Sequence, residues 1–176
     1  MEITKDQNNS FTISTKQVDV SINPQSSSKA EVVLCTHGKD EYKPNPEQIV
    51  FDMPGEYEVK NTMIDAVVCD TSTAFVVTSS GIRVSFIDNE AQLSESQIEA
   101  LGGSDILIIK VFGEKAEVLN KLISELEPSI VIPFGYTGDQ LKQLSAEFGK
   151  DVTQMPKFKI SKKDISIEDQ QLVVLE

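Results

Sequence analysis

Short runs of hydrophobic residues, separated by polar turns, fill the first half of the chain. Two of them, within residues 74–88, are joined by Thr78, Ser79, Ser80 and Gly81. A glycine in so short a connection supplies the positive φ that tight hairpins require, so a β-hairpin is predicted there. Earlier runs are rich in Val, Ile, Phe and Thr and bounded by Asn, Pro, Ser and Gly, which is typical of strands; they cover residues 2–4, 10–14, 17–22, 31–35 and 48–52.

The second half has hydrophobic residues at helical spacing. Ser94 and Gln97 have the spacing of a capping box, which predicts a short helix within residues 93–103. Thr137 and Gln140 repeat that pattern and predict a helix that stops at Gly149. A third helix is predicted within residues 114–128, and it ends before Pro128. Strands are predicted at residues 105–112, 129–134, 157–161 and 171–176.

The order of these elements favours one domain over residues 1–176. Many strands come first, and units of helix, strand and helix follow. This order indicates a mixed α/β (α+β) fold of two packed sheets with helices on their outer faces.

Charge argues against a nucleic-acid partner. The chain has 28 acidic and 16 basic residues, a formal net charge of −12. Nucleic-acid binding needs clustered lysines and arginines that neutralise phosphates. The one lysine-rich stretch, residues 157–163, is interpreted as an edge strand protected by lysines rather than as a phosphate-binding patch.

The sequence indicates a soluble, cytoplasmic protein. No apolar run approaches the roughly 20 residues that span a bilayer, so no membrane partner is expected. The first residues lack a basic region followed by an apolar core. Cys35 and Cys69 lie in apolar stretches without the spacing of a disulfide framework, and we expect buried thiols in a reducing compartment.

The chain's only histidine, His37, is the first candidate for chemistry. It follows the predicted strand at residues 31–35 and precedes Gly38. In α/β proteins the loops beyond the carboxyl ends of strands often carry functional side chains. Its position therefore suggests a metal ligand, whereas the residue types around it do not.

Four strings along the chain resemble one family. They are FDMPGEYEVKNTMIDAV (51–67), SDILIIKVFG (104–113), LEPSIVIPFGY (126–136) and KISKKDISIEDQQLVVLE (159–176). The chain is similar to the small, single-domain zinc-dependent hydrolases of the metallo-β-lactamase superfamily, in the branch of ascorbate-6-phosphate lactonase. The resemblance implies a four-layer αββα sandwich with a metal site at one edge, between the sheets.

The metal-binding motif of that family is degenerate here. The family places three histidines and an aspartate on the loop after a strand, where they bind two metal ions that activate water. In this chain the loop is His37-Gly38-Lys39-Asp40-Glu41-Tyr42. By this correspondence only His37 keeps its ligand type, because Lys39, Glu41 and Tyr42 stand at the other ligand positions.

Most of the family's other ligand positions have also changed. Asp88 survives as the bridging carboxylate, whereas Gly135 stands where a histidine normally follows the strand. The glycine-histidine turn near the N-terminus corresponds to Gln7-Asn8, and the aspartate-proline pair to Asn23-Pro24. A ligand-bearing loop after residues 64–68 is shortened to Cys69-Asp70-Thr71-Ser72-Thr73.

Two makeshift active sites can be assembled from these residues, and one of them remains as an alternative. A reduced mononuclear site would have to be built from His37, Asp88, Glu41, Cys69 and Asp70. A Cys35 nucleophile with His37 is disfavoured, because residues two apart on a strand lack the close approach and the third orienting group that a thiolate mechanism needs.

The sequence therefore predicts a catalytically inactive member of the fold with a binding or structural role and no cofactor. One alternative is a zinc-dependent hydrolase with the mononuclear site. Another is a binder of a small anionic ligand, in which Lys39, Glu41, Tyr42 and Tyr136 line the former substrate cleft. For Lys39 two interpretations stay open: its ammonium bridges to Asp88 or Glu41 as an internal substitute for the metals, or it points to solvent from a loop. The identity of a small-ligand or protein partner and the oligomeric state are not indicated.

Overall fold

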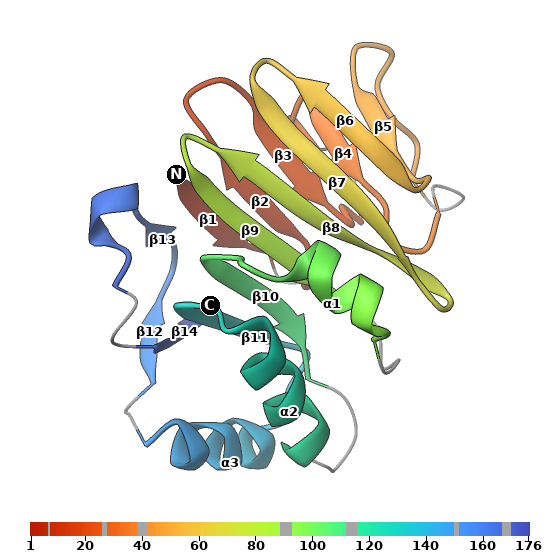
Figure 1. Cartoon of the computed structure of the whole chain (residues 1–176). Helices are drawn as coiled ribbons and strands as arrows, with labels where there is room; N and C mark the ends of the chain where they lie inside the picture. The colour runs from red at the N-terminus through yellow and green to blue at the C-terminus, as the bar shows by residue number, and fades with distance from the viewer. Residues whose placement is uncertain are drawn as a thin grey trace.

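The computed structural model describes residues 1–6, 8–25, 28–38, 42–88, 93–111, 116–149, 152–166 and 170–176. Within these ranges two β-sheets pack face to face, and three helices lie together on one outer side (Figure 1). The helices so described are α1 (Glu95–Leu101), α2 (Ala116–Leu126) and α3 (Gly138–Phe148), and a 3₁₀ turn, η1, covers Lys162–Asp164. Among the described residues, no helix is both long and apolar enough to cross a bilayer.

Within the described residues the first sheet has six strands in the order β13-β1-β2-β3-β4-β5. Its central strands are short and apolar, as the sequence pattern predicts. The six strands are β1 (Glu2–Lys5), β2 (Phe11–Ser14), β3 (Asp19–Ile22), β4 (Val32–Leu34), β5 (Ile49–Phe51) and β13 (Phe158–Lys159).

The second sheet has eight strands in the described ranges, in the order β12-β14-β11-β10-β9-β8-β7-β6. Parallel pairing joins β9, β10, β11 and β14, so the carboxyl ends of these strands lie at one edge. The bounds are β6 (Gly55–Val59), β7 (Thr62–Cys69), β8 (Ser72–Ser79), β9 (Ile82–Ile87), β10 (Ile106–Lys110), β11 (Ile130–Phe134), β12 (Thr153–Met155) and β14 (Gln171–Leu175).

Local signals in the sequence explain the helix ends. Ser94 accepts from the backbone N–H of Gln97, and the Gln97 side chain accepts from the backbone of Ser94. Thr137 and Gln140 make the same reciprocal cap at α3. Gly149 closes α3 with φ 63°, a left-handed conformation that favours glycine. Both capping boxes are therefore confirmed.

The main core lies between the two sheets. Phe11 of the first sheet makes edge-on contacts with Phe86 and Phe134 of the second, with ring centroids 5.7 and 5.1 Å apart. All three rings are buried. Burial of a large aromatic side chain contributes about 1.5–3 kcal/mol, so this cluster is a main reason that the sheets stay together.

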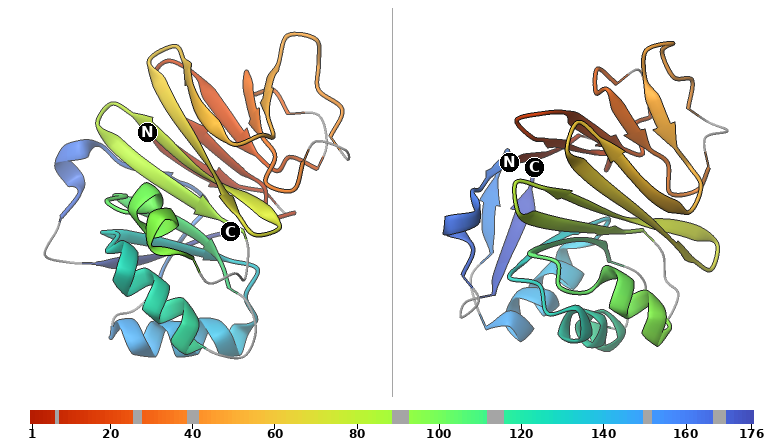
Figure 2. Two further views of the ribbon diagram at one scale, coloured as in Figure 1. Left: turned by 45° about the vertical axis from the view of Figure 1, so that its right-hand side comes forward. Right: turned by 45° about the horizontal axis from the view of Figure 1, so that its top comes forward.

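A second core lies between the eight-stranded sheet and the helices. Leu101 of α1, Ile123 of α2 and Leu144 of α3 are buried in it against the outer sheet face. Figure 2 shows the three helices on that side in both views. The predicted sandwich fold is confirmed, and the described α-helices cover the second sheet.

A small cluster covers part of the other outer face. Tyr42 packs there with Val33, Cys35 and Val50. The Tyr42 hydroxyl donates to Gln48 Oε1 at 2.7 Å, which fixes the segment after the His37 loop against the sheet. In the described part of the chain, this outer face is covered by that segment rather than by a helix.

The lysine-rich stretch lies at the edge of the first sheet. Strand β13 is the outermost strand there, so the edge-strand interpretation is confirmed. Lys159 and Lys157 lie 3.0 and 3.5 Å from Glu2 Oε2. The hydrogen bond from Lys159, aided by the charges of both lysines, lowers the pKa of Glu2 below its ordinary value.

Candidate functional site

A cleft of about 650 Å³ lies at the carboxyl ends of strands from both sheets. A cavity of this size is in the range that holds small ligands, about 300–1,000 Å³. The described residues that line it are Asn23, Pro24, Gln25, Cys35, His37, Gly38, Tyr42, Asp88 and Lys110.

Strand register brings Asp88 and Lys110, the charged pair of the described lining, together. Ile87 of β9 lies opposite Ile109 of β10 in a parallel pair. Asp88 and Lys110 are the next residues along these strands, so they leave the sheet side by side. Lys110 Nζ lies 3.0 Å from Asp88 Oδ1. The Asp88 side chain is 11% exposed and that of Lys110 is 38% exposed.

The other oxygen of Asp88 belongs to a polar network. Asn23 Nδ2 donates to Asp88 Oδ2 at 3.3 Å and to Thr36 Oγ1 at 2.8 Å. The Thr36 hydroxyl also lies 3.5 Å from Asp88 Oδ2. Asp88 Oδ2 therefore accepts hydrogen bonds, whereas the buried Oδ1 accepts none from the described residues and has the ion pair with Lys110 as its contact.

Asn23 holds the network through its backbone as well as its side chain. Its φ of 49° is in the left-handed region, which asparagine tolerates better than most residues. Its backbone N–H donates to Leu34 O at 2.9 Å, and its Oδ1 accepts from the Thr36 N–H at 2.9 Å. The turn after β3 is thus bound to the end of β4.

His37 is oriented by the same network but remains exposed. Its Nδ1 lies 2.8 Å from Thr36 Oγ1 and 3.9 Å from Asp88 Oδ2, and 54% of its side chain is exposed. The imidazole therefore stands at the rim of the cleft, with one ring nitrogen held by a hydroxyl.

Gly135 leaves space for the lysine. It follows β11, has φ 69°, and a Cβ atom added there would lie 3.2 Å from Lys110 Cγ. The aliphatic stem of Lys110 thus occupies the space that a side chain at Gly135 would need. By the sequence correspondence, this is the position of a metal-binding histidine in the resembled family.

The family described as the Beta-lactamase superfamily domain matches residues 2–135. The chain belongs to the metallo-β-lactamase superfamily. No curated protein sequence matched. The predicted superfamily is thereby confirmed.

Solved structures of this superfamily and its relatives share the fold at low sequence identity. A Thermotoga maritima protein, assigned to the zinc-dependent hydrolases of the metallo-β-lactamase superfamily, is 21% identical, with a TM-score of 0.81 over 100% of this chain and 99% of that one. The isothiocyanate hydrolase from Delia radicum gut bacteria is 9% identical, with a TM-score of 0.64 over 98% and 95%. The short form of human tRNase Z is 7% identical, with a TM-score of 0.60 over 80% and 94%. At these identities the likeness concerns the metallo-β-lactamase fold alone.

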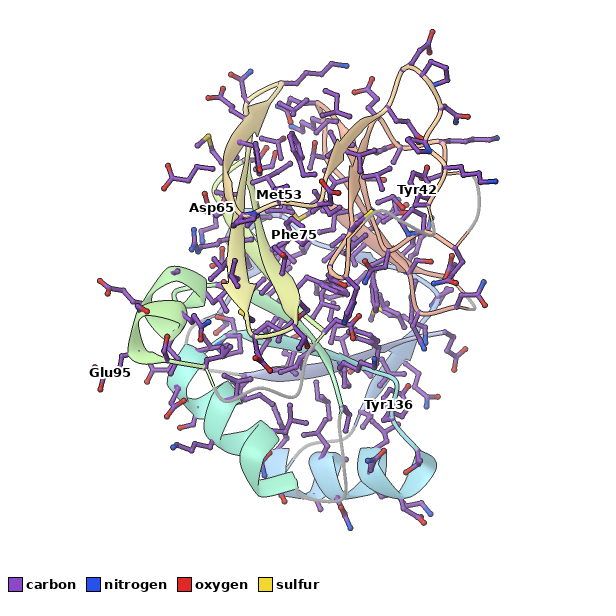
Figure 3. All side chains as sticks on the ribbon, turned by 90° about the vertical axis from the view of Figure 1, so that its right-hand side faces the viewer. Tyr42, Met53, Asp65, Phe75, Glu95 and Tyr136 are labelled. Atoms are coloured by element: carbon purple, nitrogen blue, oxygen red, sulfur yellow. The ribbon has the colours of Figure 1, made fainter. Side chains whose placement is uncertain are left out.

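Some of the site residues predicted from the sequence line the cleft of this protein, and others do not. His37, Asp88 and Tyr42 line it. Tyr136 packs instead against the core beneath the helices, and Figure 3 shows it well apart from Tyr42. Burial, followed by the negative charge of Glu176, raises the pKa of Tyr136. Lys39 and Glu41 lie outside the described residues.

Two other ligand candidates lie outside the described lining of the cleft. Cys69 is buried in the core beneath the helices, and Asp70 lies exposed in the turn between β7 and β8. Cys69 pairs with Ser72 across β7 and β8, so this chain has a tight hairpin turn there. By the sequence correspondence, the family has a ligand-bearing loop at this place. Neither residue lines the cleft among its described walls.

The described donor set does not fit the family's metal centre. No group of three or more His, Cys, Asp or Glu side chains that can hold a metal ion occurs in the described ranges. Of the family's ligand positions, those of His37 and Asp88 still carry a residue that can bind metal. The Lys110 ammonium beside Asp88 repels any cation that comes near. Zinc sites normally need three or four N, O or S ligands.

Sequence reasoning missed the residues that hold Asp88. Lys110 was part of an apolar strand prediction, and Asn23 and Thr36 had no assigned role beyond the correspondence of Asn23 with a family aspartate. A signal for Lys110 does exist in the sequence: it is a charged residue within the otherwise apolar run of residues 106–112.

Proposed function

We propose that this protein is a metal-free member of the metallo-β-lactamase superfamily that binds a small ligand in the cleft and does not hydrolyse it through bound metal. The single observation that carries the proposal is the ion pair between Lys110 and Asp88, 3.0 Å apart. Asp88 corresponds to the carboxylate that bridges two metal ions in the family. Here its partner is the ammonium group of Lys110.

The electrostatics of the site support this interpretation. A carboxylate with a mostly buried side chain is stable in the folded protein when it is paired and hydrogen-bonded. Asp88 has both, from Lys110, Asn23 and Thr36. A metal ion at Asp88 would have to displace the ammonium and leave Lys110 beside a cation, which costs free energy.

The rest of the former metal site supports the same conclusion. Asn23 is a neutral amide at a position where the family has an aspartate, and its amide atoms are already used by Thr36 and Asp88. Gly135 offers no side chain. A mononuclear site would therefore depend on His37 and Asp88, with further ligands that the described residues do not supply.

The cleft itself favours binding as the retained activity. It measures about 650 Å³, although its described lining lacks most of the family's metal ligands. Its walls combine a charged pair, amide groups and the ring of Tyr42, a mixture that is typical of small-molecule sites. We also propose a cytoplasmic location, which two buried cysteines support.

Metal analysis of the purified protein tests the proposal. Protein prepared without chelators and then dialysed against zinc should contain far less than one zinc, iron or manganese per chain. Asp88→Ala and His37→Ala should leave that low value unchanged. Stoichiometric metal in the parent chain that both substitutions remove would contradict the proposal and support the zinc-dependent hydrolase.

A further inference from the structure

We infer that the ligand of this cleft is an uncharged molecule that carries an amide group, and that the side-chain amide of Gln25 recognises it beside the imidazole of His37. The inference rests on the proposed function, because the charges of the cleft cancel only where Asp88 is held by Lys110 and not by metal. It adds the chemical class of the ligand and the residues that recognise it.

The charged pair of the described lining is compensated within the protein. Lys110 Nζ lies 3.0 Å from Asp88 Oδ1, and Asp88 Oδ2 accepts from Asn23 Nδ2. Asp88 and Lys110 are the acidic and basic members of the described lining, so their formal charges cancel. An ionic group of a ligand would lose hydration here without gaining an unpaired counter-charge, which costs free energy. The cleft therefore favours an uncharged ligand.

Two side-chain amides line the cleft, and they differ in what they can still bind. The N–H groups of Asn23 donate to Thr36 Oγ1 and Asp88 Oδ2, and its carbonyl oxygen accepts from the Thr36 N–H. Gln25 is exposed at the cleft wall, and its side chain has no hydrogen-bond partner among the described residues. Its N–H donors and its carbonyl acceptor are therefore available to a ligand.

Strand register places Gln25 close to His37. Ile22 of β3 and Leu34 of β4 are partners in a parallel pair, and Gln25 and His37 each follow three residues later. The two residues thus leave the same edge of the sheet, and both line the cleft. His37 Nδ1 is held by Thr36 Oγ1 at 2.8 Å, which leaves Nε2 as the ring nitrogen for a ligand.

An amide group complements these side chains. The carbonyl of a ligand amide can accept from the Gln25 N–H while its own N–H donates to the Gln25 carbonyl, which gives a pair of parallel hydrogen bonds. His37 Nε2 adds a donor or an acceptor, according to the tautomer of the ring. Pro24 and the ring of Tyr42 provide apolar wall for an organic body, and a cleft of about 650 Å³ has room for one.

Probes of similar shape and different charge test the class of ligand. Benzamide is uncharged at neutral pH, benzoate is an anion and benzamidine is a cation. Each is titrated at fixed pH and constant ionic strength, and the NMR signals of His37, the chain's only histidine, report binding in the cleft. Benzamide should cause a saturable shift and bind more tightly than the two ions. The absence of a saturable shift with benzamide, or binding of either ion that is as tight, would overturn the inference while leaving the proposed function intact.

Substitutions of Gln25 identify the residue that recognises the amide. Gln25→Leu should raise the Kd for benzamide about tenfold, because a pair of neutral hydrogen bonds is lost. Gln25→Glu should favour benzamidine several-fold over benzamide, because a carboxylate accepts from both amidine nitrogens. Gln17→Leu is the control, since Gln17 is exposed and outside the described lining. Circular dichroism verifies that each variant is folded. Unchanged benzamide affinity in Gln25→Leu, or an equal loss in Gln17→Leu, would overturn the inference.

The contribution of His37 is measured on the ring signals of benzamide itself, because His37→Phe removes the reporter. A several-fold loss of affinity is expected, and an unchanged affinity would contradict the assigned role of the imidazole. The parent titration is repeated with zinc and with EDTA, and the affinity for benzamide should be the same in both. If benzamide binds only with zinc, and Asp88→Ala abolishes that binding, both the inference and the proposed function are wrong.

Discussion

Gly135 and Lys110 are sterically coupled: a Cβ atom at Gly135 would lie 3.2 Å from Lys110 Cγ. Lys110 pairs with Phe134 across the parallel strands β10 and β11, and Gly135 follows Phe134 directly. The absence of a side chain at Gly135 therefore leaves space for the aliphatic stem of Lys110. In that space the lysine extends so that its ammonium lies beside Asp88.

Gly135→Ala should destabilise the protein for two reasons. The left-handed φ of 69° costs alanine about 1 kcal/mol, and the new methyl group would press on the lysine stem. We expect a loss of about 1–3 kcal/mol in the free energy of unfolding, measured by urea denaturation.

A matched control separates these two contributions. Gly149 has φ 63° and nothing within 4 Å of an added Cβ, so Gly149→Ala carries the backbone cost without the contact. In a double-mutant cycle, Lys110→Ala should relieve part of the cost of Gly135→Ala. Strict additivity of the two substitutions would contradict steric coupling.

Removal of the Lys110 ammonium should leave Asp88 with its mostly buried charge uncompensated. We expect Lys110→Met to reduce the free energy of unfolding by about 1–3 kcal/mol, moderated by the partial exposure of the lysine. Lys60→Met is the control, because Lys60 and Glu31 are each more than half exposed. An exposed pair contributes about 0–1 kcal/mol. Equal losses in the two variants would argue against a structural role of the Lys110 pair.

Elements with strong local signals were predictable from the sequence. The capping boxes at Ser94 and Thr137 depend on side chains three residues apart, and the stop at Gly149 depends on one residue. The antiparallel pair of β6 and β7 was not predicted, because its turn is formed by Lys60 and Asn61, with φ of 49° and 59°, and contains no glycine. Strand β12 was missed because it is short and exposed at two of its positions.

The site was only partly predictable for a different reason. Resemblance to the family identified His37 and Asp88, and both line the cleft. The partner of Asp88 depends on which strands are neighbours and in what register, and a single sequence does not give that information. Lys39 is the lysine that the sequence suggests for this role, because it stands where the family has a metal-binding histidine. Lys39 lies outside the described residues, so its predicted bridge stays a prediction, whereas Lys110 contacts Asp88 directly.

Tyr136 should make stability depend on alkaline pH. Burial and the charge of Glu176 raise its pKa, so the folded state keeps the phenol proton to a higher pH than the unfolded state does. Its contribution to stability is complete below the unfolded pKa, about 10, and declines as pH rises toward the folded pKa. Urea denaturation between pH 8 and about 11 should show a shallower decline for Tyr136→Phe.

The charge of Glu176 provides an independent check of that cause. Glu176→Gln removes the repulsion that disfavours the phenolate, and it should also reduce the alkaline decline, by less than Tyr136→Phe does. Glu147→Gln, at an exposed position of α3, serves as the control for a general change in net charge. If Glu147→Gln reduced the decline as much as Glu176→Gln, the local explanation would be wrong.

Chelation should have no effect on the stability of this protein. In a metal-dependent fold, metal binding contributes to the free energy of folding, so EDTA lowers the melting temperature. Here the carboxylate of Asp88 is held by Lys110, Asn23 and Thr36, which EDTA does not remove. We expect the same melting temperature, measured by scanning calorimetry, with and without EDTA and with added zinc. A decrease of several degrees on chelation, absent in the Asp88→Ala variant, would show that a metal ion at Asp88 stabilises the fold.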